Sequence, residues 1–169
     1  KHIKHSAYFY PWNDDPMGIL SDIRQRWRLI KALSGLRRDE FENNTPQDGV
    51  VDRVQVVRYP SGAGYLEPHC DPYRYQRLII SCYMSKKGVD FKSGGFYVLD
   101  SHEREVDMES TIEVGDMCIH YASILHGVKI VDEGESLDWN STQGRWFLSL
   151  YSNVSDHVKD RDTSKSIEK

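Results

Sequence analysis

The sequence has few cysteines, no long apolar run and no excess of basic charge. Its three cysteines, Cys70, Cys82 and Cys118, are an odd number without CxxC spacing, which argues against a disulfide framework and against a zinc knot. No apolar run approaches the roughly 20 residues of a membrane-spanning helix, and residues 1–10 lack a signal-peptide core. The net charge is −4, unlike that of a uniformly basic nucleic-acid-binding protein. We therefore expect a cytoplasmic or other intracellular location, with neither a membrane nor a nucleic acid as partner.

The composition is that of a folded chain. Hydrophobic residues make up 38% of the 169 residues, enough for one compact core, and the chain is too short for two ordinary domains. The spacing predicts one helix over residues 16–35, which starts at Pro16, ends at Gly35 and carries an apolar stripe made of Ile19, Ile23, Trp27 and Ile30. The opposite face is expected to be exposed to solvent and to hold Arg24, Arg28 and Lys31. With the polar connection that follows, residues 1–49 are expected to form a helical support.

From Val50 onward the pattern changes to short strands separated by turn residues such as Pro60-Ser61-Gly62. Strands are expected at Arg53–Tyr59, Gln76–Met84, Gly95–Leu99, Ser110–Glu113, Met117–Tyr121, Gly127–Val131 and Arg145–Tyr151. Many short strands with regular turns indicate a β-sandwich or barrel. We expect this core to span residues 50–155 and to be followed by a charged, frayed tail over residues 156–169.

The triplet His69-Cys70-Asp71 is the first candidate for chemistry. On an extended segment, residues i and i+2 point to the same side, so His69 and Asp71 share a face. An imidazole and a carboxylate at this spacing can occupy two adjacent coordination positions of one metal. A set of two histidines and one carboxylate suits non-haem Fe(II).

The third ligand must come from elsewhere, and two histidines compete for this role. His126 precedes a strand, at a boundary where a side chain can face the mouth of a barrel. His120 lies inside the preceding strand between Ile119 and Tyr121, a place more typical of a packed, hydrogen-bonded residue. We therefore favour His126.

Arg145 opens an otherwise apolar strand, Gly144–Tyr151. Burying a guanidinium is costly unless an anion meets it. That anion is either the carboxylate of a cosubstrate or a nearby Asp or Glu at the rim, and the strand by itself leaves both open.

An ordered set of motifs between Val54 and Val154 resembles the Fe(II)/2-oxoglutarate-dependent dioxygenases, most closely their prolyl-hydroxylase-like branch. In chain order the motifs are Tyr59-Pro60-Ser61-Gly62, His69-x-Asp71, Cys82-Tyr83-Met84, Ser93-Gly94-Gly95, His126-Gly127-Val128 and Arg145. The interval between His126 and Arg145 is longer than is usual in that family, and Phe147 stands where a serine is common.

The resemblance implies a mainly β fold, a double-stranded β-helix (jelly roll) with a supporting N-terminal α-helix. It also implies Fe(II) and 2-oxoglutarate as cofactor and cosubstrate, O2 as the oxidant and ascorbate as an accessory reductant. The residues it implies are His69, Asp71 and His126 as catalytic metal ligands, and Arg145, Tyr83 and Tyr59 as 2-oxoglutarate contacts.

The implied reaction is hydroxylation of an unactivated C–H bond, coupled to decarboxylation of 2-oxoglutarate to succinate and CO2. Its expected substrate is a peptidyl residue such as proline, or an amino-acid-like molecule. The alternatives are the same chemistry on a small-molecule metabolite, and a non-catalytic β-sandwich binding module. Two loops, residues 72–76 and residues 137–140, are expected to form walls of the entrance.

Overall fold

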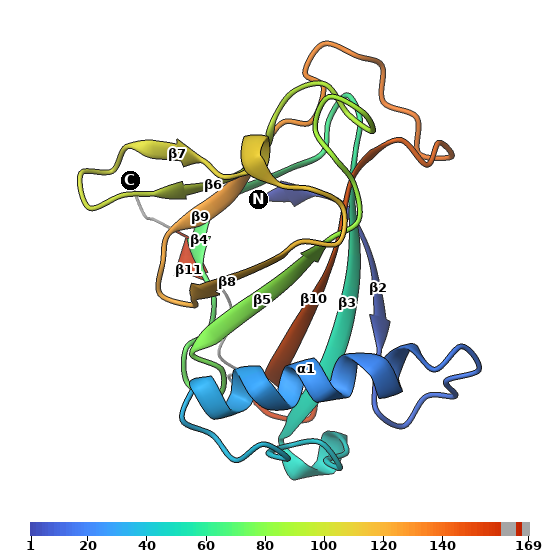
Figure 1. Cartoon of the computed structure of the whole chain (residues 1–169), viewed down its shortest axis with the longest axis vertical. Helices are drawn as coiled ribbons and strands as arrows, with labels where there is room; N and C mark the ends of the chain where they lie inside the picture. Colours follow the sequence, from blue (N-terminus) through green and yellow to red (C-terminus); the bar gives the residue numbers. More distant parts are fainter. Residues whose placement is uncertain (160–164, 167–169) are drawn as a thin grey trace.

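Two antiparallel sheets face each other in the computed structural model, which describes residues 1–159 and 165–166 (Figure 1). The first sheet contains, in spatial order, β1 (His2–Ile3), β4 (Tyr65–Cys70), β9 (His126–Lys129), β6 (Gly95–Leu99) and β7 (Glu105–Asp107), and β11 (Lys165–Ser166) also pairs with β4. The second contains β2 (His5–Phe9), β3 (Val50–Pro60), β10 (Gly144–Val154), β5 (Leu78–Tyr83) and β8 (Met117–Tyr121). This arrangement confirms the predicted mainly β jelly roll with one N-terminal helix.

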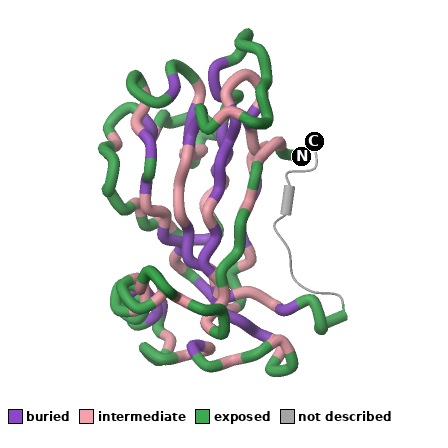
Figure 2. Tube along the Cα trace, turned by 90° about the vertical axis from the view of Figure 1, so that its right-hand side faces the viewer, coloured by how far each residue is buried: buried purple, intermediate pink, exposed green. Residues whose placement is uncertain are grey.

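Strand alternation gives the second sheet two apolar faces. On β3, Val57 and Tyr59 point between the sheets, where they pack with Phe96 and Val128 of the first sheet. Val54 of the same strand points to the outside, together with residues of β5 and β10. Figure 2 shows buried positions along the strands between the sheets. The space between the sheets is therefore the main core, and its open end is available for a site.

The helix α1 (Ile19–Leu33) covers the outer face of the second sheet and packs Trp27 and Ile30 against it. It begins later than predicted, because Gly18 has a left-handed backbone with φ of 70° and Pro16 belongs to the turn before it. Gly35, with φ of 76°, follows the helix end as predicted.

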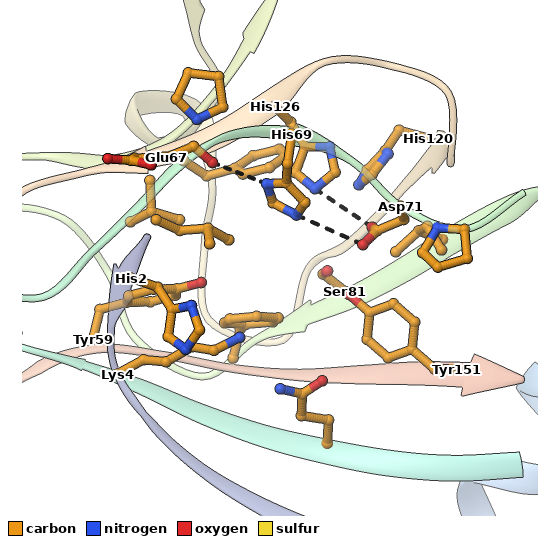
Figure 3. Close-up of a pocket in the computed structure, with 18 of the residues that line it drawn as sticks. His2, Lys4, Tyr59, Glu67, His69, Asp71, Ser81, His120, His126 and Tyr151 are labelled. Carbon is orange, nitrogen blue, oxygen red and sulfur yellow. Dashed lines mark hydrogen bonds and ion pairs between the residues drawn. The ribbon is translucent and has the colours of Figure 1, made fainter. Parts of the chain in front are cut away.

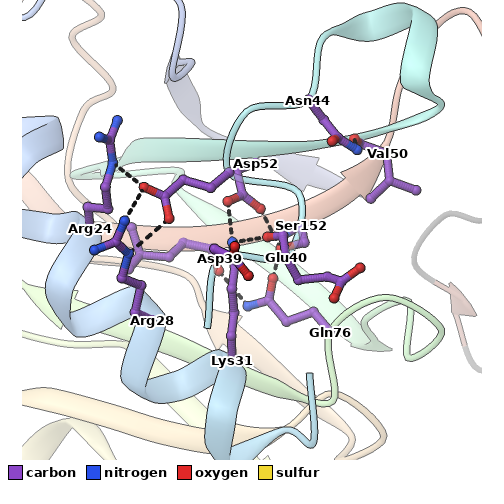
Figure 4. A network of polar contacts seen from close by, with 12 residues as sticks. Arg24, Arg28, Lys31, Asp39, Glu40, Asn44, Val50, Asp52, Gln76 and Ser152 are labelled. Carbon is purple, nitrogen blue, oxygen red and sulfur yellow. Dashed lines mark hydrogen bonds and ion pairs between the residues drawn. The ribbon is translucent and has the colours of Figure 1, made fainter. Parts of the chain in front are cut away.

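The prediction that Lys31 faces solvent is wrong. Lys31 follows Trp27 by four residues and so lies on the apolar face of α1, where it is 3% exposed. Its ammonium pairs with the buried Asp52 of β3 and lies 4.9 Å from the centre of the Trp27 ring (Figure 4). Arg24 and Arg28 do face solvent, with side chains 42% and 45% exposed, and both pair with Glu42.

The strand predicted at Ser110–Glu113 is also wrong. Residues Glu109–Thr111 form a 3-10 helix, η2. The carboxylate of Asp107 accepts hydrogen bonds from the backbone N–H of Glu109 and the hydroxyl of Ser110, at 2.8 and 2.6 Å. These bonds turn the chain, because they satisfy a backbone donor that a strand would need for its ladder.

The first residues of the chain join both sheets, which the sequence did not indicate. β1 pairs with β4, and β2 pairs with β3. The short η1 (Pro46–Asp48) precedes β3. The predicted charged tail lies mostly outside the described residues, and within it β11 pairs with β4. No helix among the described residues combines the length and the hydropathy needed to cross a membrane.

Candidate metal centre and its cavity

His69 of β4 and His126 of β9 are cross-strand partners. They stand directly opposite each other in the antiparallel register, with ring centroids 4.4 Å apart. The register between these strands shifts between Leu66 and His69, where Pro68 has no N–H to give to the ladder. The shift sets which β4 residue faces His126, so a local irregularity brings the two imidazoles together.

Both imidazoles are held by the same kind of hydrogen bond. The Nδ1 of His69 lies 3.0 Å from the carbonyl oxygen of Glu67, and the Nδ1 of His126 lies 2.8 Å from that of Ile124. A carbonyl only accepts, so each Nδ1 carries the proton and each Nε2 keeps a lone pair. This arrangement orients metal-binding histidines in proteins.

Asp71 follows β4 and completes the group. Its backbone N–H donates to the carbonyl of Ala122 at 2.9 Å, and its side chain lies 3.6 Å from Nε2 of His69 and 3.5 Å from Nε2 of His126. The three side chains each offer one ligand atom, and these atoms all lie within 4.8 Å of one another (Figure 3). The structure thus brings together the three residues that the sequence singled out.

The charges of this group suit a cation. Burial raises the pKa of the Asp71 carboxyl, but the neighbouring imidazoles of His69 and His126 lower it by more, so its pKa lies below the ordinary value. Burial lowers the pKa of His126 to about 4. An ionised carboxylate beside a neutral imidazole is the donor set that a divalent transition metal takes.

His120, the rival of His126, comes from β8 of the opposite sheet. Its ring centroid is 4.7 Å from that of His126, and its Nδ1 lies 3.1 Å from the carbonyl oxygen of Tyr121. It lines the same cavity. Among the described residues, it does not join the compact group of ligand atoms.

Arg145 is buried and paired with an acid that the sequence analysis did not identify. Its Nε donates to Glu109 at 2.7 Å, and both residues are at most 2% exposed. The same Glu109 oxygen accepts the backbone N–H of Phe96 at 2.7 Å. The acid lies in the interior and not at the rim. No described residue accepts a hydrogen bond from the two terminal nitrogens of Arg145, and Arg145 lines the cavity.

The glycine pair Gly94-Gly95 is the sequence feature that indicates a close neighbour at this place. A Cβ on Gly95 would lie 2.7 Å from Cγ of Glu109, so only glycine lets Glu109 pack there. A glycine in a strand indicates a close approach, but the sequence does not name the neighbour.

The two predicted tyrosines lie on either side of Arg145. The Arg145 guanidinium carbon is 5.7 Å from the centre of the Tyr59 ring and 5.2 Å from that of Tyr83. Burial raises the pKa of both phenols well above the ordinary value, so both stay neutral. Tyr59 lines the cavity, whereas Tyr83 does not.

A cavity of about 440 Å³ opens in front of the candidate metal ligands. Figure 3 shows those ligands on one side, with Lys4 and Tyr151 across from them. Of the loop 72–76, only Pro72 lines this cavity, and no residue of 137–140 does. The expected wall at residues 137–140 is therefore wrong: Trp139 stacks on His5, with 4.6 Å between the ring centroids.

Comparison with known proteins gives no match to a family model. In sequence, the chain is similar to the cell division protein SepF of Prochlorococcus marinus subsp. pastoris, with 26% identity over 125 residues. That match covers 66% of this chain, and the chain spans only 65% of that relative's length.

Solved structures give a more extensive match. The chain is similar to a prolyl-4-hydroxylase of Pseudomonas putida, with a TM-score of 0.59, 13% identity, and coverage of 89% of this chain and 72% of that chain. It is also similar to a full-length Neurospora crassa protein solved in complex with alpha-KG and thymine, with a TM-score of 0.51, 16% identity, and coverage of 91% and 55%. The chain therefore shares its fold with these two proteins.

Proposed function

We propose that this chain is an Fe(II)- and 2-oxoglutarate-dependent dioxygenase that hydroxylates an unactivated C–H bond. The observation that carries the proposal is the convergence of His69, Asp71 and His126, whose ligand atoms lie within 4.8 Å of one another. When bound, Fe(II) with 2-oxoglutarate and O2 supplies the oxidation, which also converts 2-oxoglutarate to succinate and CO2.

The chain's own part begins with the metal ligands. His69 and His126 each present Nε2, because their Nδ1 protons are bonded to backbone carbonyls. Asp71 contributes a carboxylate that its neighbours keep ionised. Three ligands of this type on one side leave other positions for cosubstrate and oxygen.

Arg145 is the proposed partner of the far carboxylate of 2-oxoglutarate. Glu109 holds the guanidinium by its Nε, which leaves the two terminal nitrogens to meet that carboxylate as a fork. The neutral Tyr59 lines the cavity beside Arg145 and is a proposed contact of the cosubstrate, and Tyr83 packs against the Arg145 guanidinium.

For the substrate, we propose a peptidyl residue such as proline or an amino-acid-like molecule. The likeness to a prolyl-4-hydroxylase supports the first. A small-molecule metabolite is the second candidate, supported by the likeness to the Neurospora crassa protein, whose structure is a complex with thymine. Ascorbate is the proposed accessory reductant.

The test combines metal binding and turnover. Anaerobic titration with Fe(II) is expected to show one bound metal, and the loaded protein is expected to release succinate from 2-oxoglutarate in the presence of O2. Metal binding without succinate release would contradict the enzyme assignment. Absence of both would favour a β-sandwich binding module.

A further inference from the structure

Some of the charges in the cavity are paired with neighbouring charges. Four lysines and arginines line it: Lys1, Lys4, Arg53 and Arg145. Arg145 is paired with Glu109, and Lys1 lies beside Glu67. The remaining acid of the cavity wall, Asp71, faces the two histidines. The side chains of Lys4 and Arg53 form no hydrogen bond or ion pair with a described residue.

Arg53 projects from the face of β3 that also carries Gln55 and Tyr59 into the cavity. Its Nε is buried without a hydrogen-bond partner, and none of its other nitrogens bonds to a described residue. Its guanidinium carbon lies 4.8 Å from the centre of the Tyr8 ring and 5.8 Å from that of Tyr151. Aromatic faces hold a guanidinium in place but do not satisfy its N–H donors, so leaving them without an acceptor is costly.

Lys4 supplies a second positive charge from the segment between β1 and β2. It is partly buried, and burial lowers the pKa of its amine, whereas the charge of Asp71 raises it and that of Arg53 lowers it. The amine is thus in electrostatic range of both Asp71 and Arg53. It extends the positive region from Arg53 toward the candidate metal ligands.

One molecule of 2-oxoglutarate cannot contact both Arg145 and Arg53, which lie at opposite ends of the cavity. Arg145 is in register with Tyr59, and Arg53 with Tyr151. Tyr59 and Arg53 are six residues apart on β3, a separation of about 20 Å along an extended strand. 2-Oxoglutarate has a five-carbon chain that is far shorter than this, so a molecule held by Arg145 leaves Arg53 free.

We infer that Arg53, assisted by Lys4, binds an oxyanion of the substrate, and that the substrate is a small carboxylic acid or phosphate. This inference rests on the proposed function and narrows it to a free acid such as an amino-acid-like molecule, in place of an internal peptide segment. A divalent metal, Asp71 and 2-oxoglutarate together carry one net negative charge. Arg53 and Lys4 add two positive charges to the cavity wall, which an oxyanion of the substrate would offset.

The test is a calorimetric titration of the full chain, loaded with Mn(II) and 2-oxoglutarate. Benzoate and its neutral analogue benzamide are titrated separately, and the affinity for each is measured. Benzoate joins one carboxylate to a flat ring that can stack on Tyr8 or Tyr151. Wild type is expected to bind benzoate at least tenfold more tightly than benzamide. Arg53→Gln is expected to remove this preference, and Lys4→Gln to weaken it. Arg26→Gln, which removes an exposed charge of α1, is the control and is expected to leave it unchanged.

The inference would be overturned if wild type bound benzoate and benzamide with equal affinity. It would also be overturned if Arg53→Gln reduced the preference for benzoate no more than Arg26→Gln does. If Arg53→Gln does not fold, Arg53→Lys and Lys4→Gln serve instead, with a partial loss expected for each. Separate titrations of the chain with Mn(II) and with 2-oxoglutarate distinguish failure of the dioxygenase proposal from failure of the anion-binding inference. If these fail while the unloaded chain still prefers benzoate in an Arg53-dependent way, the dioxygenase proposal falls and the anion subsite stands. Oxygen insertion into a peptide blocked at both ends, in preference to small acids, would overturn the substrate class.

Discussion

His69 and His126 face each other across β4 and β9, and the Nδ1 of each ring lies within 3.0 Å of the carbonyl oxygen two residues before it. The two imidazoles therefore have the same tautomer and the same kind of support. Backbone groups supply this support, so the fold itself sets both Nε2 atoms toward Asp71 before any ligand arrives.

Replacing Asp71 by alanine is expected to lower the affinity for Mn(II) or Fe(II) by about 100-fold or more. Losing a group that only supports a metal ligand already costs about 10- to 100-fold, and losing the ligand itself costs more. The fold should persist, since Asp71 lies beyond the end of β4. Anaerobic calorimetry measures the affinity, and circular dichroism checks the fold. His120→Ala is the comparison, and its metal affinity should stay within a few fold of wild type. A larger loss in His120→Ala than in Asp71→Ala would give the ligand role to His120.

Arg145→Lys is expected to raise the 2-oxoglutarate concentration needed for binding by about tenfold to 100-fold, because an ammonium cannot make the forked contact of a guanidinium. The charge opposite Glu109 is retained, so the cost in stability should be far below that of breaking a buried pair. Calorimetry with Mn(II) present measures the affinity. An unchanged affinity would move the role to another cation that lines the cavity, Arg53 or Lys4.

The sequence reveals the candidate metal ligands because their pattern is local. His69 and Asp71 are two residues apart, so strand alternation places them on one face, and His126 is favoured because it lies at a strand boundary. The register shift that sets His126 opposite His69 is not visible in the sequence. The partner of Arg145 is different: Glu109 is 36 residues away in a segment that looks like a strand. Lys31 escapes prediction for a related reason. Its helical spacing from Trp27 is visible, but the buried Asp52 that permits its burial is a tertiary contact.

Gly95→Ala is expected to destabilise the fold by more than its backbone strain alone. The added Cβ would lie 2.7 Å from Glu109 Cγ, at a φ of +107°. Gly88→Ala is the matched control, because Gly88 has a φ of +87° and open space around it. Strain of this kind costs about 1–3 kcal/mol, and the crowding adds to it only at Gly95. Urea denaturation of both variants measures the difference, and equal losses would show that Glu109 moves aside without cost.

Lys31→Met is expected to lower the free energy of unfolding by about 3–5 kcal/mol, because it leaves the carboxylate of Asp52 buried without its ammonium. Among the residues that the structure describes, Asp52 then keeps one side-chain donor, the hydroxyl of Ser152 at 2.7 Å. The double variant Lys31→Met/Asp52→Asn removes the orphaned charge and should recover part of the loss. Chemical denaturation measures both. A double variant less stable than Lys31→Met would show that the charge of Asp52 is tolerated without its partner.

Asp132 should make stability depend on acid pH. Its carboxylate accepts the Ser61 hydroxyl at 2.7 Å and the backbone N–H groups of Lys92 and Ser93 at 2.6 and 2.9 Å. Burial raises the pKa of Asp132, but these hydrogen bonds lower it by more, so the pKa lies below 3.8.

A carboxyl whose pKa is lower in the folded state stabilises the fold above the unfolded pKa, and loses that contribution as the pH falls through the folded value. Asp132→Asn keeps the shape and tolerates the φ of 52° at this position, but it removes the charge. The variant should therefore be less stable than wild type by about 1–3 kcal/mol at pH 7, and the gap should close below pH 3.8. Urea denaturation of both proteins from pH 7 to pH 3 measures the gap. A gap that is constant or widens in acid would show that the charge of Asp132 does not stabilise the folded state.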